Sequence, residues 1–155
     1  MLLSAALSAC GDDGATAGID AAGGGCPAIC NTLALPAVVM KTANPAARPP
    51  FTGGTIADGT YAVTSVVDYG TTMPGGVTVQ EIYRFTGTTI ETAVASSEAA
   101  EMHFCGTFST AANIITFDVT CPQTRSIDLE YTATANTFVF QHGSNMNEVA
   151  SATKQ

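Results

Sequence analysis

Turn-forming residues recur at short, regular intervals from Thr55 to the end of the chain. They fall about every 10 to 12 residues, for example at Asp58-Gly59, Pro122-Gln123 and Gly143-Ser144. Loops this short can join only antiparallel neighbours, because parallel neighbours need a crossover of about a dozen residues or more. The spacing therefore predicts eight antiparallel β-strands, over residues 60–69, 77–86, 88–96, 101–109, 114–121, 125–133, 136–141 and 146–154.

Several of these segments alternate apolar and polar residues with the two-residue period of a strand. Ile115, Phe117 and Val119 fall on one side of their strand, and Thr116 and Asp118 fall on the other. The composition agrees, since the chain has 23 Thr and only six Leu, and β-branched side chains fit a pleated surface. Each strand is therefore expected to have one buried face and one solvated face.

Eight consecutive hairpins close most simply into an up-and-down barrel. Closure removes the exposed strand edges that an open sheet leaves for aggregation. A β-sandwich is the alternative, because strand spacing alone does not separate the two folds. We expect the barrel to span residues 55–155 and to be a monomer.

An eight-stranded barrel is just wide enough either to be filled by its own side chains or to hold one small ligand. Strand parity turns many aromatic residues inward, and a packed core is one interpretation of them. The other is an apolar pocket that binds a small ligand. Parity also turns Glu81 inward, at the rim of the barrel. The five aromatic residues expected to line such a pocket are Tyr83, Phe85, Phe104, Phe108 and Phe117.

Several other function classes are disfavoured by charge and motif content. The net charge of -8, with no basic cluster, argues against a nucleic-acid partner. No nucleophile-elbow motif occurs, and His103 and His142 are expected at the surface. We therefore expect no catalytic residues, no metal and no cofactor.

Four cysteines at positions 26, 30, 105 and 121 form an even set, which suits two disulfides in an oxidising compartment. Their spacing matches no paired zinc motif. Three connectivities are possible. Strand parity places Cys105 and Cys121 on opposite faces of their hairpin, so a bond between those two would need a bulge or a loop.

The first ten residues are apolar and end with Leu7-Ser8-Ala9-Cys10, which resembles the lipobox of bacterial lipoproteins. The resemblance implies a signal peptide over residues 1–9, a diacylglycerol on Cys10, and anchoring by lipid to the bacterial cell envelope, at the outer membrane or its periplasmic face. No Lys or Arg precedes the apolar run, so either the signal is truncated or the match is accidental. The alternative is the ragged start of a secreted or cytosolic domain.

Two further segments precede the barrel. Residues 10–25 are rich in Gly, Ala and Asp and are expected to form a disordered tether. Residues 26–54 hold five of the seven Pro and are expected to form an extended arm packed on the barrel.

The segment Asp58-Gly59-Thr60-Tyr61, the threonine-rich strands and the end Thr153-Lys154-Gln155 resemble the lipocalin-like barrels of secreted bacterial lipoproteins whose function is unknown. The similarity covers roughly residues 54 to 155. It implies that Gly59 and Tyr61 begin the first strand and that Lys154 packs across Tyr61, closing one end of the barrel. Tyr61 replaces the Trp of lipocalins, and an ordinary strand start after an Asp-Gly turn is the alternative.

Overall fold

The structure is a computed structural model that describes residues 30–72, 76–143 and 146–155. All regular secondary structure in these ranges is β, and no helix in them is long and apolar enough to cross a bilayer. The ten strands are β1 (Val39–Met40), β2 (Thr42–Asn44), β3 (Gly59–Tyr69), β4 (Thr78–Thr86), β5 (Thr89–Ser96), β6 (Ala99–Ala111), β7 (Ile114–Cys121), β8 (Arg125–Ala133), β9 (Thr137–Gln141) and β10 (Glu148–Lys154).

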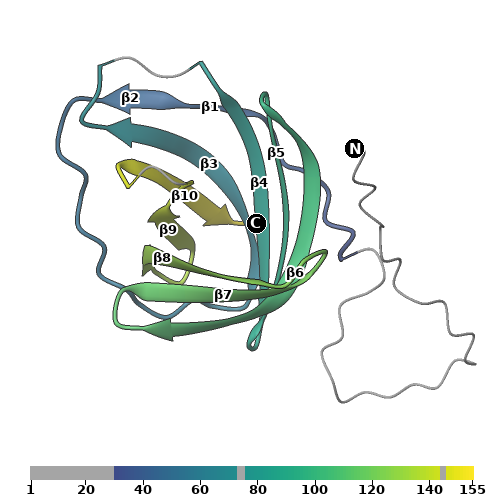
Figure 1. Ribbon diagram of the computed structural model, residues 1–155. Helices are drawn as coiled ribbons and strands as arrows, with labels where there is room; N and C mark the ends of the chain where they lie inside the picture. The colour runs from purple at the N-terminus through teal and green to yellow at the C-terminus, as the bar shows by residue number, and fades with distance from the viewer. Residues whose placement is uncertain (1–29, 73–75, 144–145) are drawn as a thin grey trace, which may run out of the picture.

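Strands β3 to β10 form a closed antiparallel barrel, in which β3 pairs with both β4 and β10 (Figure 1). The predicted eight-stranded barrel is therefore confirmed, and a β-sandwich is excluded. The strands lie where the turn spacing put them, although β6 is longer at both ends than predicted and β10 starts two residues later.

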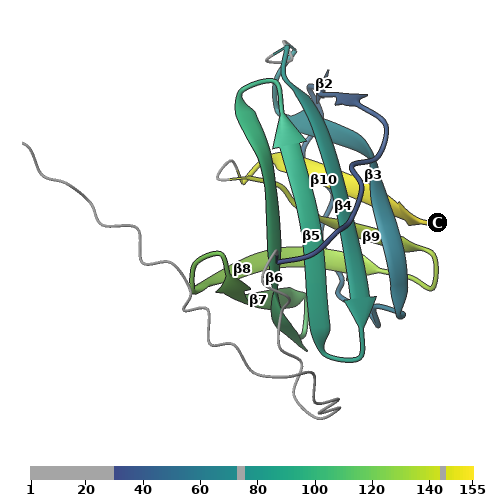
Figure 2. The same cartoon turned by 90° about the vertical axis from the view of Figure 1, so that its right-hand side faces the viewer.

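The extended arm completes the sheet at a place where the barrel strands separate. Hydrogen bonding between β3 and β4 covers only Gly59–Ala62 against Ile82–Phe85. Beyond this stretch, β1 pairs with β4, and β2 pairs with β3 in parallel. Figure 2 shows the arm crossing the outside of β5 and β4 to reach this position. The arm therefore contributes both a cover and two short strands.

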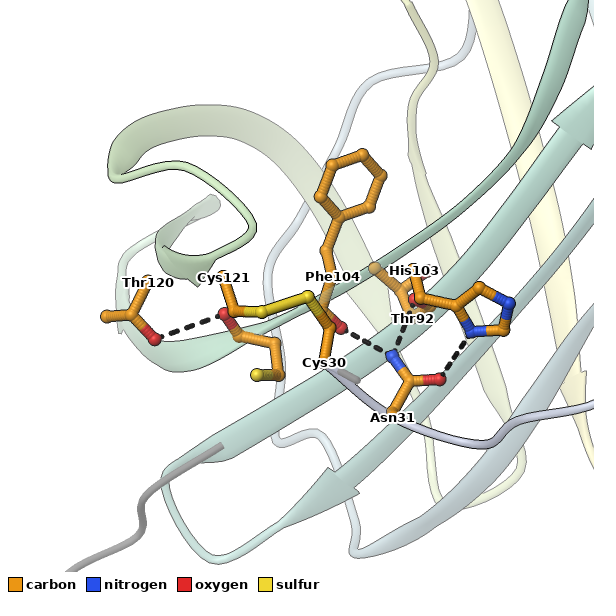
Figure 3. The surroundings of a disulfide bond; sticks show 8 residues. Cys30, Asn31, Thr92, His103, Phe104, Thr120 and Cys121 are labelled. Carbon is orange, nitrogen blue, oxygen red and sulfur yellow. Dashed lines mark hydrogen bonds between the residues drawn. A yellow bond between two sulfur atoms is a disulfide. The ribbon is translucent and has the colours of Figure 1, made fainter. Parts of the chain in front are cut away.

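The start of the arm is fixed to the barrel by a disulfide and by a buried amide (Figure 3). Cys30 is bonded to Cys121, with 5.5 Å between the Cα atoms. The side chain of Asn31 donates hydrogen bonds to the carbonyls of Thr92 and Phe104, at 3.0 and 2.7 Å. It also pairs with Nδ1 of His103 at 2.9 Å.

Cys105 is also disulfide-bonded, but Cys121 is not its partner. The two residues are directly opposed across β6 and β7, beside a bulge between Cys105 and Gly106. The bulge that a bond between them would need is thus present, yet Cys121 turns to the arm instead. Cys10, Cys26, the predicted signal peptide and the predicted tether lie outside the described residues.

Aromatic side chains fill one half of the barrel interior. Five of the largest buried side chains are Tyr61, Phe85, Tyr131, Phe138 and Phe140, each at most 1% exposed. Phe138 stacks on Phe140 with the ring centroids 4.7 Å apart. This half of the barrel is the packed core that strand parity offered as one interpretation.

Candidate functional site

The other half of the barrel contains a cavity of about 540 Å³ that is partly open to solvent. Its size falls within the range of about 300 to 1,000 Å³ that is typical of small-molecule sites. Most of its wall is apolar. The apolar lining residues are Tyr83, Ile90, Val94, Met102, Phe104, Cys105, Phe117, Val119, Ile127, Leu129 and Phe140. The polar lining residues are Glu81, Thr92, Arg125, Gln141 and His142, and Gly143 completes the wall.

The cavity is partly open to solvent. Two strands of its wall, β8 and β9, pair only along Tyr131–Ala133 and Phe138–Phe140. The earlier part of β8, from Arg125 to Glu130, has no partner in β9, and Arg125 is exposed. Because Arg125 also lines the cavity, its guanidinium stands at the entrance.

An ionic cluster of four residues closes the polar end of the cavity. The ring of His142 lies between two buried carboxylates, with Nε2 2.6 Å from Oε1 of Glu81 and Nδ1 bonded to Oε1 of Glu148. Nζ of Lys41, which lies in the arm between β1 and β2, is 2.7 Å from Oε2 of Glu148. Each carboxylate therefore has a cationic or potentially cationic partner.

The position of His142 determines its protonation. A neutral imidazole has one N–H and one lone pair, so it can donate to only one of two flanking carboxylates. Burial lowers the pKa of His142, but the hydrogen bond and charge of Glu81, followed by those of Glu148, outweigh burial and raise the pKa above 6.5. As an imidazolium, His142 donates to both carboxylates, and the cluster of two anions and two cations is neutral overall.

Tyr83 extends the cluster into the aromatic core. Its hydroxyl donates to Oε2 of Glu81 at 3.0 Å. Burial, and then the charge and hydrogen bond of Glu81, raise the pKa of Tyr83 well above its ordinary value. The phenol is therefore a neutral donor at physiological pH, and it holds Glu81 in place.

A second, smaller hollow of about 290 Å³ is lined by all four residues of the cluster. Lys41, Val79 and Glu148 line this hollow, and Glu81 and His142 line both hollows. The two hollows therefore adjoin at Glu81 and His142, and Val94, Met102 and Gly143 also line both.

Three of the five aromatic residues predicted to line a pocket do so, namely Tyr83, Phe104 and Phe117. The other two, Phe85 and Phe108, do not line it and pack edge to face, with their ring centroids 5.1 Å apart. Their side chains belong to the filled half of the barrel, so including them in the pocket was wrong.

The residues predicted to close the barrel meet at the end opposite the ionic cluster. Lys154 is the cross-strand partner of Tyr61. Its stem lies over Gly59, where a Cβ would come within 2.4 Å of the lysine Cε and where the φ angle is +147°. Tyr61 is fully buried and donates from its hydroxyl to the carbonyl of Ala57 at 2.7 Å.

The prediction for His142 was wrong, because the side chain is buried between two carboxylates and not at the surface. Strand parity could have predicted the inward position of His142, since this residue continues the inward series of Phe138 and Phe140 by one further step. The same rule links Glu148 to the buried Ala150 and Ala152. No sequence signal indicates Lys41, because the arm has no periodicity that shows which side chains turn inward.

Among the described residues, no group of three His, Cys, Asp or Glu side chains is arranged to hold a metal ion. Glu81, His142 and Glu148 are instead paired with one another, with Lys41 and with Tyr83. Comparison of the chain with protein-family models, with curated proteins and with solved structures gives no match.

Proposed function

We propose that the protein binds a small apolar molecule in the cavity of its barrel and is held at the bacterial cell envelope by a lipid on Cys10. The observation that supports binding is the cavity of about 540 Å³, with a predominantly apolar wall and an entrance beside Arg125. Burying apolar ligand surface there is favourable by roughly 25 cal/mol per Å². Because an aromatic core fills the other half of the interior, a barrel that serves solely as a structural or interaction module is the second interpretation.

A neutral fluorescent probe tests binding directly. Phenylnaphthylamine, which brightens in apolar surroundings, is expected to titrate the protein to saturation. Ile127→Trp places an indole in the cavity wall and is expected to weaken probe binding about tenfold or more, because it overfills the space. Ser126→Trp is the matched control, since Ser126 is exposed and its hydroxyl bonds Asp118 on the outer face.

A saturable signal that only Ile127→Trp weakens supports the ligand-binding function. Absence of saturation with folded protein, or equal loss in both variants, contradicts it and leaves the structural module. Circular dichroism and thermal unfolding establish that each variant is folded.

The lipid anchor rests on the lipobox-like segment and has its own test. Mass spectrometry of protein extracted from the membrane fraction of a bacterial host is expected to find a diacylglycerol on Cys10 at the mature N-terminus. An unmodified Cys10 thiol in the mature protein contradicts the anchor. A secreted protein that retains the barrel function is then the alternative.

A further inference from the structure

One charge at the cavity differs from all the others in having no counter-ion. The chain has three arginines, and two of them are paired, Arg48 with Glu130 and Arg84 with Glu91. No carboxylate among the described residues pairs with Arg125. Its guanidinium instead lies 4.9 Å from the ring centroid of Phe104, at the cavity entrance.

The ionic cluster does not supply that counter-ion. Glu81 and Glu148 are satisfied by His142 and Lys41, and the cluster is neutral as a whole when His142 is protonated. Arg125 is therefore the uncompensated charge among the cavity-lining residues. A planar guanidinium with free N–H groups matches the geometry of a carboxylate or a phosphate.

A hydroxyl without a partner lies in the same part of the wall. Oγ1 of Thr92 is inaccessible to solvent and makes no hydrogen bond. Leaving a buried donor unsatisfied is unfavourable, so such an atom points to a partner that the chain itself does not provide. Thr92 lines the cavity and is the cross-strand partner of Phe104.

Phe104 therefore has Thr92 beside it on the neighbouring strand β5, and the Arg125 guanidinium lies over its ring. In Figure 3, its ring points away from Asn31, which holds its carbonyl from the outer side. That hydrogen bond fixes the backbone beneath the ring, and hence the surface on which Arg125 rests. A donor and a cation are thus placed around one aromatic ring at the edge of an apolar space.

We propose that the cavity binds a single-chain amphiphile with an anionic head group. The apolar chain lies in the cavity, and the head group lies at the entrance, bonded by the Arg125 guanidinium. Rotation of the Thr92 side chain about χ1 turns its buried hydroxyl to the same head group. This inference rests on the proposed ligand-binding function and adds the class of ligand.

The net charge of -8 opposes an anionic ligand only at long range. At physiological ionic strength, exposed charges are screened beyond about 8 Å. A head group in contact with Arg125 interacts with that charge directly. The local pair therefore decides the preference, and the remaining charge slows the approach of the ligand.

The test uses three ligands of equal chain length that differ in the head group, namely dodecanoate, dodecanol and dodecylamine. Each displaces phenylnaphthylamine from the full chain, below the concentration at which it forms micelles. Dodecanoate is expected to bind about tenfold more tightly than dodecanol, because its carboxylate accepts a charge-assisted hydrogen bond from Arg125. Dodecylamine is expected to bind more weakly than dodecanol, because its charge faces Arg125.

Arg125→Gln is expected to remove the preference for dodecanoate, so that this variant binds dodecanoate no more tightly than dodecanol. Arg84→Gln is the matched control, because Arg84 is paired with Glu91 and does not line the cavity. Thr92→Val, which keeps the shape of the side chain, is expected to weaken the binding of dodecanoate about threefold to tenfold.

The outcomes separate the two proposals. If dodecanol and the probe bind but dodecanoate has no advantage, or if its advantage survives Arg125→Gln, the head-group assignment is wrong and the binding function stands. Tighter binding of dodecylamine than of dodecanol also overturns it, since Glu81 would then select a cation. If no ligand and no probe binds, the binding function itself fails.

Discussion

At the scale of single residues, the main feature is a histidine held between two buried carboxylates. His142 bonds Glu81 through one ring nitrogen and Glu148 through the other. Charged groups taken out of water are costly unless they are paired, and removing one partner of a buried pair costs about 3 to 5 kcal/mol. The cluster therefore makes the stability of the barrel depend on the protonation of one side chain.

The stability of the protein is expected to fall as the pH rises above 6.5. The pKa of His142 is raised in the folded state, so the folded protein binds more protons than the unfolded chain between pH 6.5 and that raised value. Its contribution is complete below the unfolded pKa and is lost as the pH passes through the folded pKa, with a slope of at most about 1.4 kcal/mol per pH unit. Urea unfolding over a pH series measures this change.

His142→Ala is expected to cost about 3 to 5 kcal/mol at pH 6 and to abolish most of the pH dependence. His103→Ala is the matched control, since His103 pairs with Asn31 and with the half-exposed Glu101 outside the cavity. An unchanged slope in His142→Ala would show that another group carries the dependence.

At the scale of secondary-structure elements, the arm is held on the barrel at two places, its start and its middle. Asn31 is 2% exposed and holds β5 and β6 through two carbonyls. The Cys30–Cys121 bond closes a separation of 91 residues next to it. Together they anchor one end of the arm, and the β1 and β2 pairings anchor the middle.

Weakening the arm anchor is expected to expose a tryptic cleavage site. Lys41 lies in the arm, and its side chain is mostly buried in an ion pair with Glu148. Asn31→Ala removes buried hydrogen bonds worth about 1 kcal/mol each and leaves two carbonyls without that donor. Limited proteolysis with trypsin should then cut after Lys41 several-fold faster. Asn136→Ala, at an exposed turn, is the control, and equal rates in both variants would contradict the anchoring role.

Gly106→Ala is expected to disrupt the β6–β7 pairing. A Cβ at this position would come within 2.1 Å of the carbonyl oxygen of Asp118, and backbone atoms cannot move aside as a flexible side chain can. We expect a loss of more than about 1 kcal/mol in the free energy of unfolding, measured in guanidinium chloride. Thr107→Ala, on the exposed side of the same strand, should cost clearly less. Comparable losses would mean that the close approach is readily relieved.

At the scale of the whole molecule, the barrel is divided into a packed half and a hollow half. The packed half is closed by Tyr61, Phe138 and the stem of Lys154 over Gly59. The hollow half has two gaps in its strand pairing, one between β3 and β4 and one between β8 and β9. The arm fills the first gap, and Leu129 and Gln141, on the two sides of the second, line the cavity.

This division predicts unequal costs for two similar truncations. Phe138→Ala removes a fully buried ring that contacts Tyr83, Phe85 and Phe140, and should cost about 3 to 5 kcal/mol. Phe104→Ala removes a ring that already borders empty space and is only partly buried, and should cost about half as much. Chemical denaturation of the two variants compares them. Equal costs would indicate that the hollow half is as tightly packed as the other.

The fold was largely determined by local patterns in the sequence. Turn residues and the alternation around Phe117 specify where strands begin and which face is buried, because both depend only on near neighbours in the chain. The same patterns located Tyr83, Phe104 and Phe117 on the cavity wall and turned Glu81 inward.

Tertiary structure alone decided which inward positions are packed and which border a cavity. Phe85 and Phe108 share the inward parity of Tyr83 and Phe104, yet they fill the core, because packing depends on partners brought together by barrel closure. Lys41 reaches Glu148 across 107 residues of chain, and Cys30 reaches Cys121 across 91. Such contacts follow from where the arm crosses the barrel, and no periodicity within the arm specifies that path.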